Sequence, residues 1–427
     1  MKKAGLCLMI ITVLFLASCK SNALPDTYIE ESDYQYKQWA GTAYSQLQQG
    51  KGFVYFYHNC FIYYLEEGID VITPLCNRAD CLHDQEQDAE KRKACNAYVD
   101  FEGYESMAHD AVTIAKCGDY IYCMNPAAFL GTRQTLCRYA LDGTAKEAVY
   151  TWDSEESAVL EWIIHRDVLY YTEKRYFQKD NEVIVENMVK SLALTGNNRK
   201  PQTIYQADEN LNVFSLCDLR AYGNHVYFLI ISQWKGDGNT IRADELYDRL
   251  YDKTFVYNIQ KDEIKELQIP GLPVSAQILG VQFWQDKIII DPYDQEKEGN
   301  ALMPVYIAEL DGSNPTVLLQ DVAQAGYFLS DGEYLYAFDD WMPDIDEWLS
   351  NPGLYTVYDK NLNVVDTLKA PFMPDGKSKR LPVGETDNMY FIYEDEEDGT
   401  WGVVRWDKGN IGSYQGESFS LTEIAYR

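Results

Sequence analysis

The stretch Gly52-Phe-Val-Tyr-Phe-Tyr57 sets the pattern that organises the rest of the chain: a turn residue followed by a short aromatic and β-branched run. Such runs favour β-strands, and glycine adopts the positive φ of a tight turn without steric penalty. The spacing of the copies averages about 55 residues, just above that of four-stranded propeller blades. The further copies are Gly118-Asp-Tyr-Ile-Tyr122, Arg166-Asp-Val-Leu-Tyr-Tyr171, Gly223-Asn-His-Val-Tyr-Phe228, Gln285-Asp-Lys-Ile-Ile-Ile290, Asp331-Gly-Glu-Tyr-Leu-Tyr336 and Thr386-Asp-Asn-Met-Tyr-Phe391.

A second hairpin follows several of these copies. Its turn is short and polar, and an Asp-Gly pair suits a two-residue hairpin loop. The examples are Cys137-Arg-Tyr-Ala-Leu-Asp-Gly143, Val256-Tyr-Asn-Ile-Gln-Lys-Asp262, Val305-Tyr-Ile-Ala-Glu-Leu-Asp-Gly312 and Leu354-Tyr-Thr-Val-Tyr-Asp-Lys360. Two hairpins in each copy predict an all-β fold, a single β-propeller of seven four-stranded blades, with six or eight blades as the alternatives.

The two ends of this pattern suggest how the ring closes. No strand-like run precedes residue 53, so the first copy lacks a clear inner strand. The chain ends in Phe419-Ser-Leu-Thr-Glu-Ile-Ala-Tyr426, a strand-like run left over after the seventh copy. We therefore expect this C-terminal strand to join the first blade and close the ring, because that pairing removes two exposed sheet edges.

The N-terminus carries a targeting signal. Lys2 and Lys3 precede an apolar run from Ala4 to Ala17, which is typical of a signal peptide and too short for an ordinary spanning helix. The run ends in Leu16-Ala-Ser-Cys19, which resembles the bacterial lipobox. This resemblance implies a signal peptide over 1–18 and a lipid, palmitate included, on Cys19. The alternative is a generic secretion signal with an incidental cysteine.

Lipidation would anchor the protein to the cell membrane, facing the outside. The polar residues 19–49 are predicted to form the lipidated N-terminus and a tether to a folded body over 50–427. The whole chain is strongly acidic, with 37 Lys and Arg against 67 Asp and Glu and a net charge of −30. Such a surface disfavours nucleic acid and anionic lipid as partners. We expect a monomer that contacts the membrane only through its N-terminal lipid.

The rhythm of residues 50–427 resembles that of bacterial lipoproteins with YWTD-like (low-density-lipoprotein-receptor type) propeller domains of unknown function. The signature Tyr-Trp-Thr-Asp itself does not occur, and Tyr150-Thr-Trp152-Asp is a permuted form of it. The resemblance implies a cell-envelope lipoprotein and assigns no ligand.

Four residues of an insertion between the first two blades, over 76–109, have the types of a metal site. They are Cys76, Cys81, His83 and Cys95, in a Cys-x4-Cys-x-His…Cys pattern that resembles a cluster recurring in lipoproteins of this kind. Three thiolates and one imidazole form a tetrahedral zinc-type ligand set. A structural zinc would replace the core that this polar insertion lacks.

Disulfides are the competing interpretation, because exported chains favour them. Cys60 and Cys76 are symmetric about Gly68, the expected turn of one hairpin, and Cys123 and Cys137 fall on consecutive strands of the second blade. Disulfides within the 76–95 segment and free thiols are further alternatives. The remaining histidines have no ligand-like spacing and are predicted to be structural: His58, His109, His165 and His225.

Acidic loops late in the chain suggest a ligand-binding face. Carboxylates there could attract a basic, cationic or glycan ligand, and tryptophans offer flat stacking surfaces. The alternative is that these residues are solvated loop tips. The predicted face consists of Asp339, Asp340, Trp341, Asp344, Asp346, Trp348, Glu396, Asp398 and Trp401.

No catalytic residue is predicted, because the chain lacks a Gly-x-Ser-x-Gly elbow, a P-loop and a His-Glu-x-x-His motif. The leading hypothesis is a lipid-anchored, non-catalytic binding or sensing propeller. The alternatives are an extracellular hydrolase or lyase acting on glycan or cell-wall material, and a structural envelope component. An enzyme requires carboxylates or a histidine to converge in one cleft, and this distinguishes the hypotheses.

Overall fold

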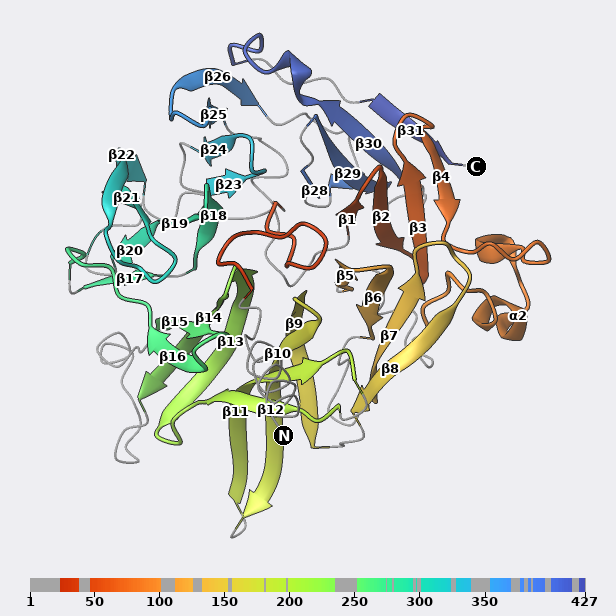
Figure 1. Cartoon of the computed structure of the whole chain (residues 1–427), viewed down its shortest axis with the longest axis horizontal. Helices are drawn as coiled ribbons and strands as arrows, with labels where there is room; N and C mark the ends of the chain where they lie inside the picture. The colour runs from red at the N-terminus through yellow and green to blue at the C-terminus, as the bar shows by residue number, and fades with distance from the viewer. Residues whose placement is uncertain are drawn as a thin grey trace, which may run out of the picture.

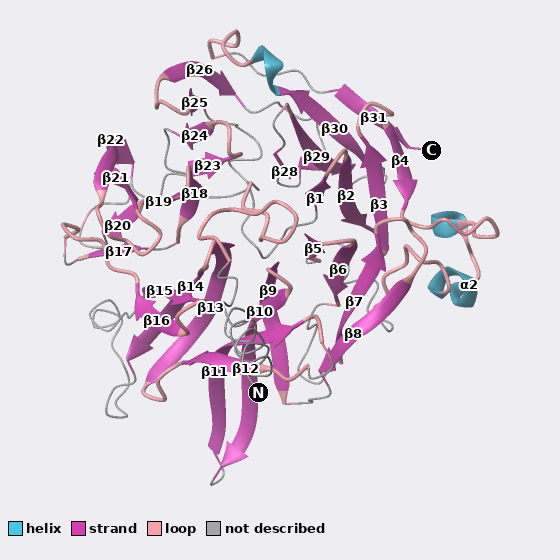
Figure 2. Ribbon diagram, in the orientation of Figure 1, coloured by secondary structure: helices cyan, strands magenta, loops and turns pink. Residues whose placement is uncertain are grey.

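The computed structural model describes residues 24–37, 47–100, 112–125, 133–152, 156–179, 182–196, 199–234, 252–273, 275–278, 280–294, 297, 301–323, 328–338, 354–369, 377–379, 383–384, 387–395, 401–416 and 422–426. Strands dominate this part of the chain, and its helices are short (Figure 2). They are η2 (His83–Gln85), α2 (Ala89–Lys93) and η6 (Lys408–Asn410). The prediction of an all-β fold is confirmed. None of the described helices is long and apolar enough to cross a membrane.

Most strands belong to four-stranded antiparallel sheets that each use a continuous part of the chain. The first three are β5 (Ile114–Cys117), β6 (Tyr120–Met124), β7 (Gln134–Ala140), β8 (Lys146–Trp152); β9 (Ser157–His165), β10 (Val168–Lys179), β11 (Glu182–Ala193), β12 (Gln202–Gln206); and β13 (Leu211–Tyr222), β14 (His225–Trp234), β15 (Lys253–Asn258), β16 (Glu263–Glu266). The next two are β18 (Gln282–Trp284), β19 (Lys287–Ile290), β21 (Leu302–Ala308), β22 (Thr316–Ala323); and β23 (Phe328–Ser330), β24 (Leu335–Phe338), β25 (Leu354–Tyr358), β26 (Val364–Lys369). A small ribbon pairs β17 (Ala276–Ile278) with β20 (Pro292–Asp294).

The two ends of the chain share one larger sheet. Its first half is β1 (Leu47–Gly50), β2 (Phe53–His58), β3 (Phe61–Glu66) and β4 (Val71–Pro74). Its second half is β27 (Lys377–Lys379), β28 (Val383–Gly384), β29 (Asn388–Asp395), β30 (Trp401–Asp407) and β31 (Thr422–Tyr426). Parallel pairing of β31 with β4 joins the halves, at Ala425 opposite Val71 and Tyr426 opposite Ile72.

The sheets surround a common centre, with β1, β5, β9, β13, β18, β23 and β28 innermost, so the fold is of propeller type (Figure 1). The seven copies of the sequence pattern each span the turn into the second strand of a sheet, as their spacing predicts. The core lies between neighbouring sheets. One cluster, for example, packs Leu136 and Trp152 of the β5–β8 sheet against Trp162 and Tyr171 of the next sheet.

The prediction for the closing strand is wrong in its pairing. The first sheet has its own inner strand, β1, which sequence inspection missed because Leu47-Gln-Gln-Gly50 is mostly polar. The C-terminal strand β31 is instead the outer strand of the last sheet, where it pairs antiparallel with β30. It touches the first sheet only at the outer strand β4. The two ends therefore meet at the rim of the molecule.

The predicted tether also differs from the structure where it is described. Residues 24–37, here called the N-terminal strap, lie across the centre of the propeller (Figure 1). Arg166 Nε donates to Asp33 at 2.8 Å, and both side chains are buried. The Tyr36 ring packs against Tyr222 and Phe283. The strap is thus part of the folded body and covers the hairpin-turn end of the inner strands.

Candidate metal centre and acid-base groove

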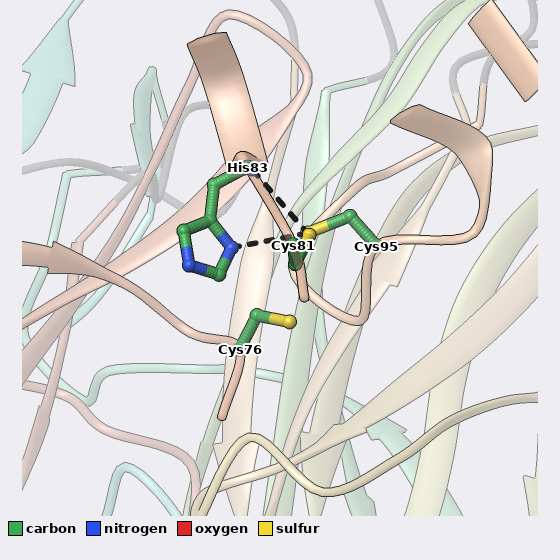
Figure 3. Close-up of side chains that lie close together, drawn as sticks. All are labelled: Cys76, Cys81, His83 and Cys95. Carbon is green, nitrogen blue, oxygen red and sulfur yellow. Dashed lines mark hydrogen bonds between the residues drawn. The ribbon is translucent and has the colours of Figure 1, made fainter. Parts of the chain in front are cut away.

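The four residues of the predicted metal site converge. Cys76 follows β4, Cys81 precedes η2, His83 is the first residue of η2, and Cys95 follows α2. One donor atom from each lies within 4.8 Å of the others, and Figure 3 shows the three sulfurs and the imidazole gathered around one point. Cys95 Sγ is 3.6 Å from His83 Nδ1, and the backbone N–H of His83 donates to Cys81 Sγ at 3.4 Å. Since ligands of a tetrahedral zinc stand about 3.5–3.8 Å apart, this donor set fits such an ion after a small contraction.

Backbone geometry places the histidine in the cluster. His83 has φ 52°, a left-handed conformation that few non-glycine residues adopt. Such strained positions persist where the surroundings hold them, often at functional sites. Burial lowers the pKa of His83, so its imidazole is neutral and can act as a ligand, and burial raises the pKa of the Cys95 thiol.

Contacts with the β7–β8 turn hold the loop in place. Gly143 O accepts from the Asn77 N–H at 3.2 Å and from Asn96 Nδ2 at 2.8 Å. Gly143 has φ 70°, and a Cβ there would stand 3.0 Å from Cys76 Cα. Glycine at this turn therefore allows Cys76 to approach the cluster.

Two cationic side chains donate hydrogen bonds to backbone carbonyl groups of the loop. Lys146 Nζ donates to Lys93 O at 2.6 Å and to Tyr98 O at 3.1 Å. Arg78 Nη1 donates to Ala94 O at 2.7 Å, next to the Cys95 ligand. These bonds give the polar insertion a defined shape without an apolar core of its own.

The observed register argues against the Cys60–Cys76 disulfide. Tyr63 faces Pro74 across the β3–β4 pair, so continuing the ladder places Cys76 opposite Phe61, and a one-residue offset turns a side chain to the other face of a sheet. Cys123 and Cys137 do face each other on β6 and β7, as predicted. No disulfide joins any of the eight described cysteines from Cys60 to Cys217 in this structure.

The predicted acidic face falls largely outside the described residues. This applies to Asp339, Asp340, Trp341, Asp344, Asp346, Trp348, Glu396 and Asp398. Trp401 is described, and it does not offer a free stacking surface. Its ring stacks on His58 at 4.2 Å between centroids and packs against Tyr63 at 5.0 Å, so it belongs to the core between the last and first sheets.

A second polar site was not predicted. His225, at the start of β14, lines a groove of about 530 Å³ at the hairpin-turn end of the β13–β16 and β18–β22 sheets. The residue is only 6% exposed, and its Nδ1 has no hydrogen-bond partner among the described residues. Asp26 Oδ1, from the strap, is 3.4 Å from this nitrogen.

The hydrogen bonds around His225 define its tautomer. The Lys261 N–H donates to Asn258 Oδ1 at 2.9 Å, which turns the Asn258 amide nitrogen toward His225 Nε2 at 3.1 Å. Nε2 therefore accepts, and the single proton of the neutral ring lies on Nδ1, facing Asp26. Burial lowers the pKa of His225 and favours this neutral form.

Carboxylates dominate the rest of the groove. Its charged lining comprises Asp26, Glu263, Asp286, Glu309 and Asp311 against Lys261 and Lys265. Hydrogen bonds from Ser313 lower the pKa of Asp311, which keeps this carboxyl ionised. The groove thus combines a neutral imidazole N–H donor with an ionised Asp311 and further carboxyl groups. Sequence reasoning missed it because these residues come from two sheets and the strap, and no local spacing connects them.

The other histidines follow the prediction of structural roles where they are described. His165 is completely buried with both ring nitrogens hydrogen-bonded, and His58 stacks on Trp401. His109 lies outside the described residues.

No family model and no curated protein matches this sequence. Among solved structures, a prolyl endopeptidase matches over 91% of this chain and 51% of its own, with a TM-score of 0.52 and 11% identity. An acylaminoacyl peptidase matches over 74% of this chain and 46% of its own (TM-score 0.45, 12% identity). An oligogalacturonate lyase in complex with manganese matches over 72% of this chain and 74% of its own (TM-score 0.39, 10% identity).

The prediction of a non-catalytic binding or sensing propeller is corrected by this comparison, because the match with a TM-score above 0.5 is a prolyl endopeptidase. The chain spans about half the length of the two peptidases. At 11% identity the likeness shows the fold alone, so any reaction of this chain is a proposal.

Proposed function

We propose that the protein is an extracytoplasmic hydrolase or lyase whose reactive centre is the groove around His225. The observation that carries this proposal is the convergence of a buried histidine, with an unpaired Nδ1, and several carboxylates in one cleft. Such convergence is what an acid-base site requires and what scattered surface carboxylates lack.

The geometry suggests a role for each group. The neutral His225 donates its Nδ1 proton in a hydrogen bond to a substrate oxygen and stabilises negative charge that develops there. Asp26, 3.4 Å away, or the ionised Asp311 removes a proton from the substrate or from water. The same pair of roles serves either hydrolysis or elimination.

The groove suits a polar, hydroxyl-rich substrate such as a glycan or other cell-wall material. Its lining is mostly charged or amide side chains, with Val256 and Leu310 as apolar members. Lys261 and Lys265 provide cations for an acidic group on such a chain.

Lipidation at Cys19 would place this groove near the membrane. We propose that Cys19 is lipidated and that the chain is a member of the envelope lipoproteins its sequence resembles. Asp26 follows Cys19 by seven residues, which span at most about 25 Å. The hairpin-turn end of the propeller would then face the membrane surface. Replacing Cys19 with Ala should abolish fatty-acid labelling, and labelling of the variant would contradict this assignment.

We also propose that the sheets form one ring of seven blades. Five are the four-stranded sheets, and the other two are the halves of the larger sheet, β1–β4 and β28–β31. Contacts between neighbouring inner strands, such as β5 with β1 and β9, and β1 with β28, support this arrangement. A closed ring would hold the strap's residues against turns from several blades at once.

The reaction is tested with the purified protein on a panel of envelope polysaccharides and peptidoglycan fragments. New reducing ends would indicate hydrolysis, and new unsaturated sugar ends would indicate elimination. We expect product from at least one substrate and its loss in His225→Asn. Asp262→Asn, in the neighbouring turn but outside the groove lining, is the control and should keep full activity. Equal activity of His225→Asn and the wild type would refute the proposal.

A further inference from the structure

The last and first sheets meet at one place, called here the seam: strand β31 paired with strand β4. The pairing is short, with Ala425 opposite Val71 and Tyr426 opposite Ile72. So short a parallel ladder contributes little to holding the two sheets together, because each backbone hydrogen bond adds only about 1 kcal/mol of stability. Side chains must therefore supply much of the attachment at the seam.

Two side-chain groups cross the seam. Arg405 Nη1 on β30 donates to Asp70 Oδ1 at 2.5 Å. The Trp401 ring packs against both Tyr63 of the first sheet and Tyr426 of β31. These contacts join the sheets directly.

A third group comes from the Cys/His loop. Asp84 Oδ2 accepts hydrogen bonds from Tyr63 Oη at 3.1 Å and from Tyr426 Oη. One carboxylate thus connects β3 of the first sheet with the C-terminal strand. Hydrogen bonds to an ionised acceptor are stronger than those between neutral groups.

Asp84 directly follows His83, a member of the Cys/His cluster. Its only regular structure is η2, a single turn whose described residues are not buried. The carboxylate therefore depends on the conformation of residues 76–95, which lack an apolar core. Any contact that fixes the backbone conformation of His83 therefore also restricts the position of the Asp84 carboxylate.

We infer that Cys76, Cys81, His83 and Cys95 bind a soft-ligand divalent metal of the zinc class, and that this metal locks the seam through Asp84. With the metal bound, His83 is held in its left-handed conformation and Asp84 faces the two tyrosines. Without it, the loop loosens and the seam loses the bridge between Tyr63 and Tyr426. This inference does not depend on the enzymatic proposal.

The test uses the full-length protein, with metal content from elemental analysis and amide hydrogen exchange measured with and without a zinc chelator. We expect about one equivalent of zinc. Its removal should speed exchange of β31 amides at least about tenfold, because the lost bonds involve a charged acceptor. Amides of β14, on the far side of the ring, should be unchanged.

Substitutions distinguish the loss of the metal-dependent contacts at the seam from a general destabilisation of the fold. Cys81→Ser should lose the metal and reproduce the effect of the chelator, whereas Cys217→Ser should keep both metal and seam. Tyr426→Phe should keep the metal. Its β31 amides should exchange fast even with the metal bound, and adding the chelator should change their exchange little. Absence of bound metal would overturn the inference. So would bound metal whose removal leaves β31 exchange unchanged.

Discussion

The backbone N–H of Tyr34 donates to Nδ1 of His165 at 3.0 Å, joining the N-terminal strap to the end of β9 across 131 residues of sequence. The other ring nitrogen, Nε2, donates to Gly223 O at 2.8 Å in the next sheet. The neutral ring therefore carries its proton on Nε2. One buried histidine thus holds the strap and two sheets together.

Acid should release the strap. Burial lowers the pKa of His165 from 6.5 to about 4, against the opposing effect of Asp33. A histidine with a lowered folded-state pKa stabilises the fold above the unfolded value, and this contribution is lost as the pH falls from 6.5 toward 4. The shift corresponds to roughly 3 kcal/mol at full effect. Limited proteolysis or hydrogen exchange of residues 24–37 should report increasing opening between pH 6.5 and 4.

His165→Gln provides the control for this titration. Glutamine can accept from Tyr34 and donate to Gly223 but does not ionise in this range. Its strap should open less than that of the wild type as the pH is lowered. Identical pH profiles for the two proteins would show that His165 is not the group responsible.

A buried ion pair should hold the last two sheets together. Lys408 Nζ donates to Asp331 Oδ2 at 2.8 Å, and both residues are 2% exposed. Replacing Lys408 with Met leaves the carboxylate buried without its cation and should cost about 3 kcal/mol of unfolding free energy. The exposed pair Lys360–Glu333 is the matched control, and Lys360→Met should cost less than about 1 kcal/mol. Similar losses in chemical denaturation of both variants would contradict this account.

The repeated hairpins could be predicted because their signals are local. A turn residue before an aromatic, β-branched run marks the second strand of the five four-stranded sheets and of both halves of the larger sheet, but no such run marks the β17–β20 ribbon. β1 was missed because Leu47-Gln-Gln-Gly50 is mostly polar and contains no aromatic or β-branched residue. Its Gln48 is buried, but its amide oxygen accepts from the Lys116 N–H of β5. That partner is distant in sequence and gives no local signal.

Whether each candidate site could be predicted depended on how far apart its residues lie in the sequence. The Cys/His cluster was predictable because its four residues fall within 20 positions and have the types of metal ligands. The Cys60–Cys76 pairing assumed a hairpin symmetric about Gly68, and the observed register differs from that one by a single residue. The His225 groove depends on Asp26, which lies 199 positions earlier in the chain and reaches it only because the strap folds back.

Gly143→Ala tests the contact that positions Cys76. A Cβ at this residue would stand 2.9 Å from Asn77 N and 3.0 Å from Cys76 Cα, both backbone atoms that cannot easily move. We expect reduced zinc occupancy in the purified variant. Gly196→Ala is the control, because Gly196 also has a positive φ of 90° but nothing within 4 Å of the added carbon. Full occupancy in Gly143→Ala would show that this turn does not position the ligand.

Deletion of residues 422–427 removes strand β31, which pairs with β30 and β4. Both partners then become exposed sheet edges, so we expect a lower melting temperature and increased aggregation. The substitution Glu423→Gln, which retains the strand, should change the melting temperature far less. An unchanged melting temperature after the deletion would mean that the seam does not contribute to stability.

The mass of the untreated protein tests the metal centre most directly, when it is measured under native and then denaturing conditions. We predict a native mass that exceeds the denatured mass by one zinc ion, with all eight mature cysteines from Cys60 to Cys217 reduced after denaturation. A protein that binds no metal and whose mass is lowered by two hydrogens for each disulfide, with Cys76, Cys81 or Cys95 cross-linked in peptide maps, would contradict it.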